Sequence, residues 1–299
     1  MIPTKNRSHF LLDAVSSLIL QERRPDQLVI IDQSDDDGGK LLVKSRLNEV
    51  RDIELVYVLD NTIKSLIAAK VESLKYVTGD LVGFFDDDIW LEKDYIKVLE
   101  EGFIRFPEML GSSGIPTNYS PKNFWFRSLF NIFHTGIFSD IRRDIYDRKL
   151  GQNQELILSS KLSGGSLWRS EVFSFVPFDT DNALHLTEDI DFSTRVYSGC
   201  GPGLYINTNA KLEHYRTPIN RASLRKLHES KLREYFIFFK KRRGSVKVLL
   251  SFVWLLIGLY LEAILKSMLY MTLDPLKGTF RGSILGFFYE DNISAFRPE

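Results

Sequence analysis

Short apolar runs alternate with longer amphipathic stretches over roughly the first third of the chain. The runs hold few polar side chains, which is typical of parallel strands that are buried on both faces of a sheet. They comprise a short opening piece that ends at Pro3 and residues 28–31, 53–59 and 81–85. Residues 10–19, 40–50 and 63–77 repeat apolar side chains at helical spacing. This alternation predicts an α/β fold with a mostly parallel, doubly wound sheet flanked by helices.

The C-terminal part of the chain has a different pattern. Residues 221–243 form a basic helical stretch, and residues 248–261 are almost wholly apolar. Apolar character continues to residue 273, which makes the segment long enough to span a bilayer. Its few polar or small positions fall on one narrow helical stripe, which favours a helix that lies in the membrane interface or packs against a partner. They are Ser251, Gly258, Glu262 and Lys266.

Further along, glycines recur every four residues, at Gly278, Gly282 and Gly286. If this segment is helical, the glycines lie on one face and allow close contact with a neighbouring helix.

Charge divides the 299 residues in the same way as hydropathy. The net charge is zero, but residues 1–215 carry 24 basic and 32 acidic side chains, whereas residues 216–243 carry 10 and 2. We therefore expect a domain over 1–215 and a helical, membrane-associating extension over 216–299. Basic residues before an apolar helix favour the cytoplasmic face of the cell membrane, with either peripheral binding or a single C-terminal span. A C-terminal core helix with a solvated basic face is the alternative.

Cysteine content and the N-terminus bear on the compartment. Cys200 is the single cysteine, which excludes an internal disulfide and fits a reducing environment. The first residues become polar almost at once, so the sequence predicts no signal peptide.

Three consecutive aspartates, Asp86-Asp87-Asp88, follow the apolar run over 81–85. Ligands of open α/β sheets bind beyond the carboxyl ends of the strands, so these carboxylates are placed where a ligand is expected. Clustered carboxylates repel one another unless a cation lies among them, and oxygen ligands suit Mg²⁺ or Mn²⁺. The alternative is a solvated acidic turn. A second acidic group, Glu188-Asp189 with Asp191, opens a predicted helix, where the helix dipole also favours acidic residues.

Four segments in this order resemble the family 2 glycosyltransferases, inverting enzymes of the GT-A fold that use nucleotide-sugar donors. They are residues 2–7, residues 29–32, residues 84–88, and residues 188–191 followed by Arg195. The resemblance covers roughly residues 1–215. It implies that Pro3, Thr4 and Asp32 contact the nucleotide, together with Asp86 and Asp87 of the acidic triplet.

The resemblance also implies roles for the remaining candidate residues. Asp88 would ligate the metal, Mn²⁺ or Mg²⁺, and Asp86 would face the ribose or the metal. Asp189 is the expected catalytic base, with Glu188 as the rival. His214 is either a further metal or phosphate ligand or a packing residue.

Two basic positions are also of interest. Lys70 and Lys64 both lie at the distance before the aspartates where the family places a basic residue near the nucleotide, although at least one is expected to be solvated. Arg195 is expected to pair with Asp191 at i+4.

The expected function is the transfer of one sugar from a nucleotide diphosphate-sugar to a hydroxyl of a glycan or polyprenyl-linked acceptor, in surface polysaccharide assembly. The chain has no Q-x-x-R-W motif, the signature of processive synthases in this family, so a single-sugar transferase is expected. The alternatives are a sugar-phosphate nucleotidyltransferase, against which no Gly-rich, Arg-containing loop follows the first strand, and an inactive membrane-tethered scaffold. No nucleic-acid partner is expected.

Overall fold

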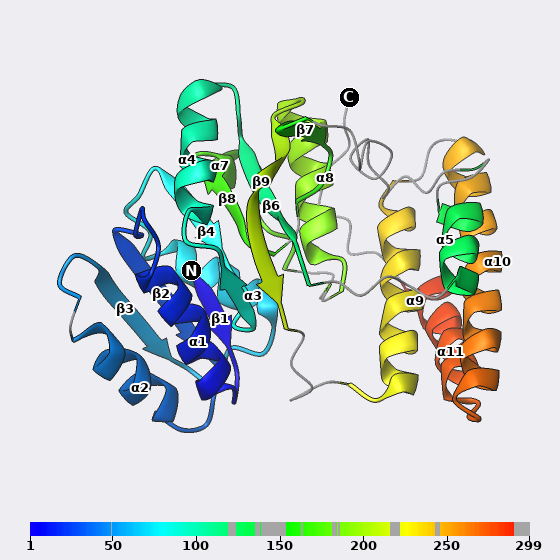
Figure 1. The fold of residues 1–299 in the computed structure, drawn as a ribbon. Coiled ribbons are helices and arrows are strands. Elements are labelled where there is room, and N and C mark those ends of the chain that lie inside the picture. Colours follow the sequence, from blue (N-terminus) through cyan, green and yellow to red (C-terminus); the bar gives the residue numbers. More distant parts are fainter. Residues whose placement is uncertain are drawn as a thin grey trace.

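A computed structural model describes most of the chain as an α/β body with a group of helices beside it (Figure 1). The described residues are 1–48, 50–118, 124–134, 138, 154–162, 164–180, 184, 186–215, 222–242 and 246–289.

The first part of the body is a parallel sheet of three strands with β2 in the middle. The strands are β1 (Ile2–Thr4), β2 (Gln27–Asp32) and β3 (Glu54–Leu59), and the helices that follow them are α1 (Ser8–Ile19), α2 (Gly38–Leu47) and α3 (Leu66–Leu74). Successive residues of β2 enter different cores, since Leu28 and Ile30 pack in one apolar cluster and Val29 and Ile31 in another. The predicted α/β class and the parallel order of these elements are confirmed.

The second sheet is mixed, and its strands run in the order β4-β8-β6-β9-β5, with β7 also paired to β9. Only β6 and β9 pair in parallel among these strands. The strands are β4 (Leu81–Phe84), β5 (Ile89–Leu91), β6 (Gly111–Pro116), β7 (Leu156–Ser159), β8 (Ser166–Arg169) and β9 (Leu204–His214). Helices α4 (Tyr95–Arg105), α7 (Val172–Phe175) and α8 (Glu188–Cys200) accompany them.

Met1 joins the two sheets. Its amino group donates to the carbonyl of Gly83 at 2.8 Å, and its own carbonyl accepts from the Phe85 amide at 3.0 Å. The carboxyl ends of β1, β2 and β4 are therefore neighbours along one edge, which is where the sequence predicts ligand binding.

The helical group consists of α5 (Phe124–His134), α9 (Leu224–Lys240), α10 (Val246–Leu269) and α11 (Asp274–Phe287), and α10 lies at its outer side in Figure 1. The predicted glycine contact is present between α11 and α9. A methyl carbon on Gly278 would lie 2.2 Å from the carbonyl oxygen of Arg225, and one on Gly282 would lie 2.3 Å from that of Glu229. The two backbones can approach this closely only because these positions have no side chain.

The polar stripe of α10 faces its own protein. Ser251 and Gly258 are buried, and Glu262 pairs with Lys231 of α9 at 3.1 Å and with Lys266 at 2.7 Å. The stripe thus packs against neighbouring helices of the same chain, and membrane association of α10 stays a prediction.

The basic end of α9 differs from the solvated or lipid-facing cluster that the sequence suggests. Lys240 donates to the carbonyls of Phe287 and Tyr289, and Lys241 and Arg242 contact Asp191 of α8. The physical reason is that a carboxylate as buried as Asp191 requires counter-charges from its own protein.

Candidate active site

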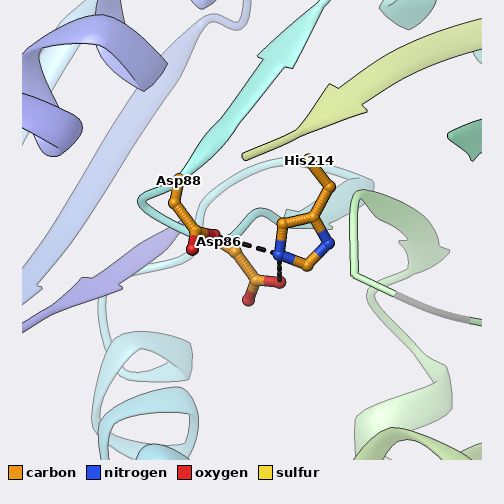
Figure 2. Close-up of side chains that lie close together, drawn as sticks. All are labelled: Asp86, Asp88 and His214. Carbon is orange, nitrogen blue, oxygen red and sulfur yellow. Dashed lines mark ion pairs between the residues drawn. The ribbon is translucent and has the colours of Figure 1, made fainter. Parts of the chain in front are cut away.

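An imidazole and two carboxylates meet beyond the end of β4 (Figure 2). Asp86 and Asp88 belong to the turn between β4 and β5, and His214 is the last residue of β9. The antiparallel pairing of β5 with β9 aligns Ile89 with His214, which brings the histidine beside the turn. Its Nε2 lies 3.1 Å from Oδ1 of Asp88 and 3.8 Å from Oδ2 of Asp86.

This cluster fits a divalent cation. Each of the three residues offers one ligand atom, and these atoms lie within 4.8 Å of one another. The side chain of Asp86 is 35% exposed and that of Asp88 is 9% exposed, so the group is anchored on one side and open on the other. Two carboxylates with one imidazole suit Mn²⁺ well, and Mg²⁺ accepts the carboxylates. The structure thus brings the three predicted metal ligands together.

Asp87 lies between these two aspartates and points elsewhere. It is buried and accepts hydrogen bonds from the Thr4 hydroxyl at 2.7 Å and from the Arg7 guanidinium at 3.0 Å. Burial raises the pKa of Asp87 to about 6, against the opposing effect of these two partners. Asp87 therefore connects the end of β1 to the turn after β4. The sequence predicts that Asp87 contacts the donor, and it does not predict these bonds to Thr4 and Arg7.

Asp32 is at the end of β2, next to Thr4 of β1. Its Oδ1 accepts from the Ser34 amide at 2.9 Å and its Oδ2 from the Tyr57 hydroxyl at 2.5 Å, while the residue is only 1% exposed. Pro3 is also buried and pairs with Ile31. The three residues predicted to contact the nucleotide are thus adjacent at one sheet edge, with Asp32 engaged in an internal network.

The second acidic pair begins helix α8. Glu188 Oε1 forms an ion pair with the Lys70 ammonium at 2.7 Å, and both side chains are buried. Burial opposes the charge of Lys70, but Glu188 outweighs it and holds the pKa of Lys70 above its ordinary value. Among the residues the structure describes, Oε2 of Glu188 has no hydrogen-bond partner. Lys64, in contrast, is exposed and donates to the carbonyl of Asn61, so Lys70 is the lysine at this site.

Among the described residues, no cation forms an ion pair with Asp189. Its Oδ1 accepts from the Ile190 amide at 2.8 Å. Burial, followed by the negative charge of Glu188, raises the pKa of Asp189 to about 7, although Lys70 opposes the shift. A carboxylate with a pKa near neutrality is suited to accept a proton at physiological pH.

One cavity of about 280 Å³ is lined by Asp86 of the first acidic pair and by both members of the second pair. Asp86 and His214 lie on its wall together with Glu188, Asp189 and Lys70. Aromatic rings complete much of the remaining wall, from Phe84, Phe85, Trp168, Phe178 and Phe192. Charged groups that can hold a cation and a group that can accept a proton therefore face the same space.

Gly164, the first of two glycines before β8, forms part of this wall. Gly165 has a φ of 83°, and a methyl carbon on Gly164 would lie 2.6 Å from Oδ2 of Asp86. The buried hydroxyl of Tyr95 fixes the loop, because it donates to the Gly165 carbonyl at 2.5 Å and accepts from the Gly114 amide at 2.8 Å. The glycines are visible in the sequence, but a single tyrosine in an amphipathic helix gives no signal of this role.

Comparison with known proteins identifies the family of the chain. The sequence profile described as Glycosyl transferase family 2 matches residues 1–173. Among curated proteins, the chain is similar to "Glycosyltransferase GlyA" of Streptococcus pneumoniae serotype 4 (strain ATCC BAA-334 / TIGR4), with 24% identity over 233 residues. That match covers 77% of this chain and 32% of the relative, so the chain spans about a third of the relative's length.

Solved structures share the fold. The mannosyltransferase PcManGT from Pyrobaculum calidifontis, in complex with GDP-Man and Mn²⁺, matches with a TM-score of 0.60 and 13% identity, over 95% of this chain and 83% of that one. S. aureus TarS 1–349 in complex with UDP matches with a TM-score of 0.52 and 15% identity, over 90% of this chain and 72% of that one. At this identity the likeness extends to the fold alone.

Proposed function

The chain belongs to glycosyl transferase family 2, and from that premise we propose that it transfers a single sugar, with inversion, from a nucleotide diphosphate-sugar to a hydroxyl of a glycan or polyprenyl-linked acceptor. Such a step fits a role in surface polysaccharide assembly. The observation that carries the proposal is the shared cavity, in which Asp189, with its pKa raised to about 7, faces the Asp86 and His214 side of a candidate cation site.

The donor is proposed to bind along the edge formed by β1, β2 and β4. Pro3, Thr4 and Asp32 would contact the nucleotide, with Asp87 holding Thr4 in place. Relatives of the same fold carry GDP-Man or UDP, which supports a nucleotide diphosphate donor here without naming the base or the sugar.

Asp86, Asp88 and His214 would hold Mn²⁺ or Mg²⁺. When bound, such a cation supplies Lewis-acid stabilisation of the departing nucleoside diphosphate. The imidazole favours Mn²⁺, because nitrogen ligation is uncommon for Mg²⁺.

Asp189 is proposed to accept the proton of the acceptor hydroxyl. Inversion by direct displacement requires one carboxylate on the side of the attacking oxygen, and Glu188 is less suited because Lys70 already neutralises it at 2.7 Å. Within that pair, the negative charge of Glu188 raises the pKa of Asp189, and Lys70 limits the rise.

The enzymatic proposal is tested by incubating the full chain with a panel of UDP-, GDP- and dTDP-sugars and Mn²⁺, and measuring released nucleoside diphosphate. We expect turnover with one class of donor. A nucleotidyltransferase would instead release pyrophosphate from a nucleoside triphosphate and a sugar phosphate, and a scaffold would release neither product. Failure to bind any nucleoside diphosphate in the presence of Mn²⁺ would refute sugar transfer.

The chain is also proposed to bind the membrane surface through α10. By length and composition, this helix is apolar enough to cross a membrane. Its exposed face carries no charge between Leu249 and Met268, whereas its charged residues Glu262 and Lys266 turn toward the protein. The exposed apolar residues are Leu249, Leu250, Val253, Ile257, Leu261, Ile264, Leu265 and Met268.

An in-plane position is favoured over a span. The opposite face of α10 is buried against neighbouring helices, so a spanning α10 would carry the charged helix α9 into the hydrocarbon layer. The exposed charged side chains in the described parts of α5, α10 and α11 are all basic, which complements an anionic leaflet. They are Arg127, Lys247, Lys277 and Arg281.

Vesicle flotation tests this surface. The protein is expected to float with vesicles containing phosphatidylglycerol, and the double variant Val253→Asp with Ile257→Asp should stay in solution. Leu41→Asp, at a leucine of α2 that is 62% exposed, is the matched control and should float normally. Equal flotation of the double variant would argue against α10 as the lipid contact.

A further inference from the structure

Helix α9 contacts the start of helix α8, which carries the second acidic pair. We propose that α9 belongs to the catalytic apparatus and that Glu234, Lys241 and Arg242 are positioning residues for Asp189. The inference rests on the proposed role of Asp189 as the base. It assigns a task to helix α9 that is separate from membrane contact.

Glu234 makes the first contact. It is 1% exposed, and its Oε2 accepts hydrogen bonds from the amides of Leu186 at 2.7 Å and Thr187 at 3.0 Å and from the Thr187 hydroxyl at 3.2 Å. Thr187 is the N-cap residue of α8 and makes no side-chain cap of its own. The amides that precede a helix require an acceptor when buried, and here a neighbouring helix supplies it.

The charge of Glu234 also suits its position. The N-terminus of a helix carries partial positive charge, so a carboxylate beside it is stabilising. Asp189 lies two residues after Thr187 in the first turn of α8, so bonds that hold the cap residue also restrain the backbone of Asp189.

Asp191 makes the second contact, one residue past Ile190. It is 1% exposed and is surrounded by three cations, Arg195 at 2.9 Å, Lys241 at 3.1 Å and Arg242 at 3.4 Å. Burial alone would raise the pKa of Asp191, but Lys241, Arg242 and Arg195 together hold it below the ordinary value. Asp191 is thus ionised and held from α9 at neutral pH.

The basic side chains at this contact have further partners that fix their direction. Lys241 also pairs with Asp179, and Arg242 donates to Thr194 at 3.1 Å and lies over the Phe238 ring at 3.7 Å. Glu234 and this cluster bracket Asp189 on both sides along α8. A displacement of about 1 Å at a reacting group is enough to cost on the order of a hundredfold in rate.

The position of α9 itself is set by α11. The glycine face of α11 lies against the α9 backbone at Arg225 and Glu229, and Gly286 lies against the Phe236 side chain. The helical group therefore braces the proposed base, and the predicted boundary after residue 215 does not separate an independent appendage from a complete catalytic domain.

The experiment compares Glu234→Gln with Glu229→Gln in the full chain. Both residues are buried glutamates of α9, but in the described part of the chain the Glu229 carboxylate pairs with Lys226 at 2.7 Å and Arg281 at 3.4 Å and not with α8, and α11 packs on the backbone of Glu229, which the substitution leaves in place. Glu234→Gln should lower kcat by about 10–100-fold while the donor KM and the Kd for nucleoside diphosphate change by less than about twofold. Glu229→Gln should leave kcat within about twofold of the parent protein.

Equal kcat for the two variants would overturn the proposal, as would a parallel loss of donor affinity and kcat in Glu234→Gln. Lys241→Met provides the second test if Glu234→Gln does not fold. It should lower kcat with donor binding intact, and Lys241→Arg should restore most of the loss. An unchanged kcat in Lys241→Met would count against the proposal.

Failure of the proposed function gives a different pattern. If Asp189→Asn keeps full turnover, the base assignment is wrong, whatever Glu234→Gln does. If Asp189→Asn is inactive and both Glu234→Gln and Lys241→Met are fully active, the positioning proposal is refuted and the proposed base is not.

Discussion

The two acidic pairs at the cavity use the same side-chain chemistry in different surroundings. Asp86 and Asp88 follow a strand and lie near the imidazole of His214, and Asp86 stays partly open to solvent. Glu188 and Asp189 begin a helix beside a buried lysine, and of these two carboxylates it is Glu188 that forms the ion pair with the lysine. One pair is therefore arranged to share a cation, whereas the other leaves a single carboxylate with a pKa of about 7.

The proposed roles of these acidic side chains therefore depend on the groups around them and not on residue type. Repulsion within the first pair is relieved if a metal binds between its carboxylates. In the second pair the ammonium of Lys70 compensates the negative charge of Glu188, whereas burial raises the pKa of Asp189. Each of the following variants removes one element of this contrast.

Asp189→Asn should have the largest effect, because an amide cannot accept the acceptor's proton. We expect kcat to fall by about a thousandfold or more, with nucleoside diphosphate binding unchanged. Donor turnover and calorimetric binding are measured on the same sample. Asp52→Asn, at an exposed aspartate paired with Arg24, is the control and should behave as the parent protein.

Asp88→Asn should act on the other pair, through the cation. Loss of one charged ligand is expected to weaken Mn²⁺ binding by about 10–100-fold, and high Mn²⁺ should recover part of the activity. The readout is the Mn²⁺ dependence of turnover together with direct metal binding. An unaltered Mn²⁺ affinity would remove Asp88 from the ligand set.

Glu188→Gln should separate the two rivals for the base. The negative charge of Glu188 contributes to the raised pKa of Asp189, so its removal should move the acid limb of kcat/KM to lower pH, by up to about one unit. Turnover should persist at a reduced level. Complete inactivity with intact donor binding would instead identify Glu188 as the base.

The smallest effect is expected on stability. Folding raises the pKa of Asp189 from an unfolded value of about 4 to about 7, so the folded state favours the protonated form and loses stability as pH rises across that interval. Without metal, Asp189→Asn should therefore unfold at a temperature roughly 2–4 °C higher than the parent at pH 8, and this difference should be smaller at pH 5 and vanish near about pH 3. A difference of the same size at both pH values would contradict the raised pKa.

The sequence predicts the first half of the molecule well, for physical reasons that can be named. Strands buried on both faces and amphipathic helices between them leave strong periodic signals, and the aspartates follow a strand end directly. The resemblance to the family predicts Lys70 near the site, because the family places a basic residue at that distance before the aspartates, and its partner Glu188 is itself a candidate.

Other contacts join residues that no local pattern connects. The hydroxyl of Tyr95 meets Gly165, and the carboxylate of Glu234 meets Thr187, across 70 and 47 positions of sequence. The basic run at the end of α9 suggested a solvated or lipid-facing cluster, because charge alone does not reveal a buried counter-ion such as Asp191. Long-range pairing of buried charges depends on tertiary structure, which the periodic pattern of a single chain does not encode.

The glycine face of α11 limits which substitutions the sequence can accept. Gly278, Gly282 and Gly286 perform no chemistry, yet a methyl group on any of them would force α11 away from α9. A deep mutational scan selected only for sugar transfer should therefore show a depleted position every fourth residue along a helix that contacts neither substrate. Intolerance to substitution is often taken to mark an active centre. Along α11 it would instead reflect the short distance between two helices.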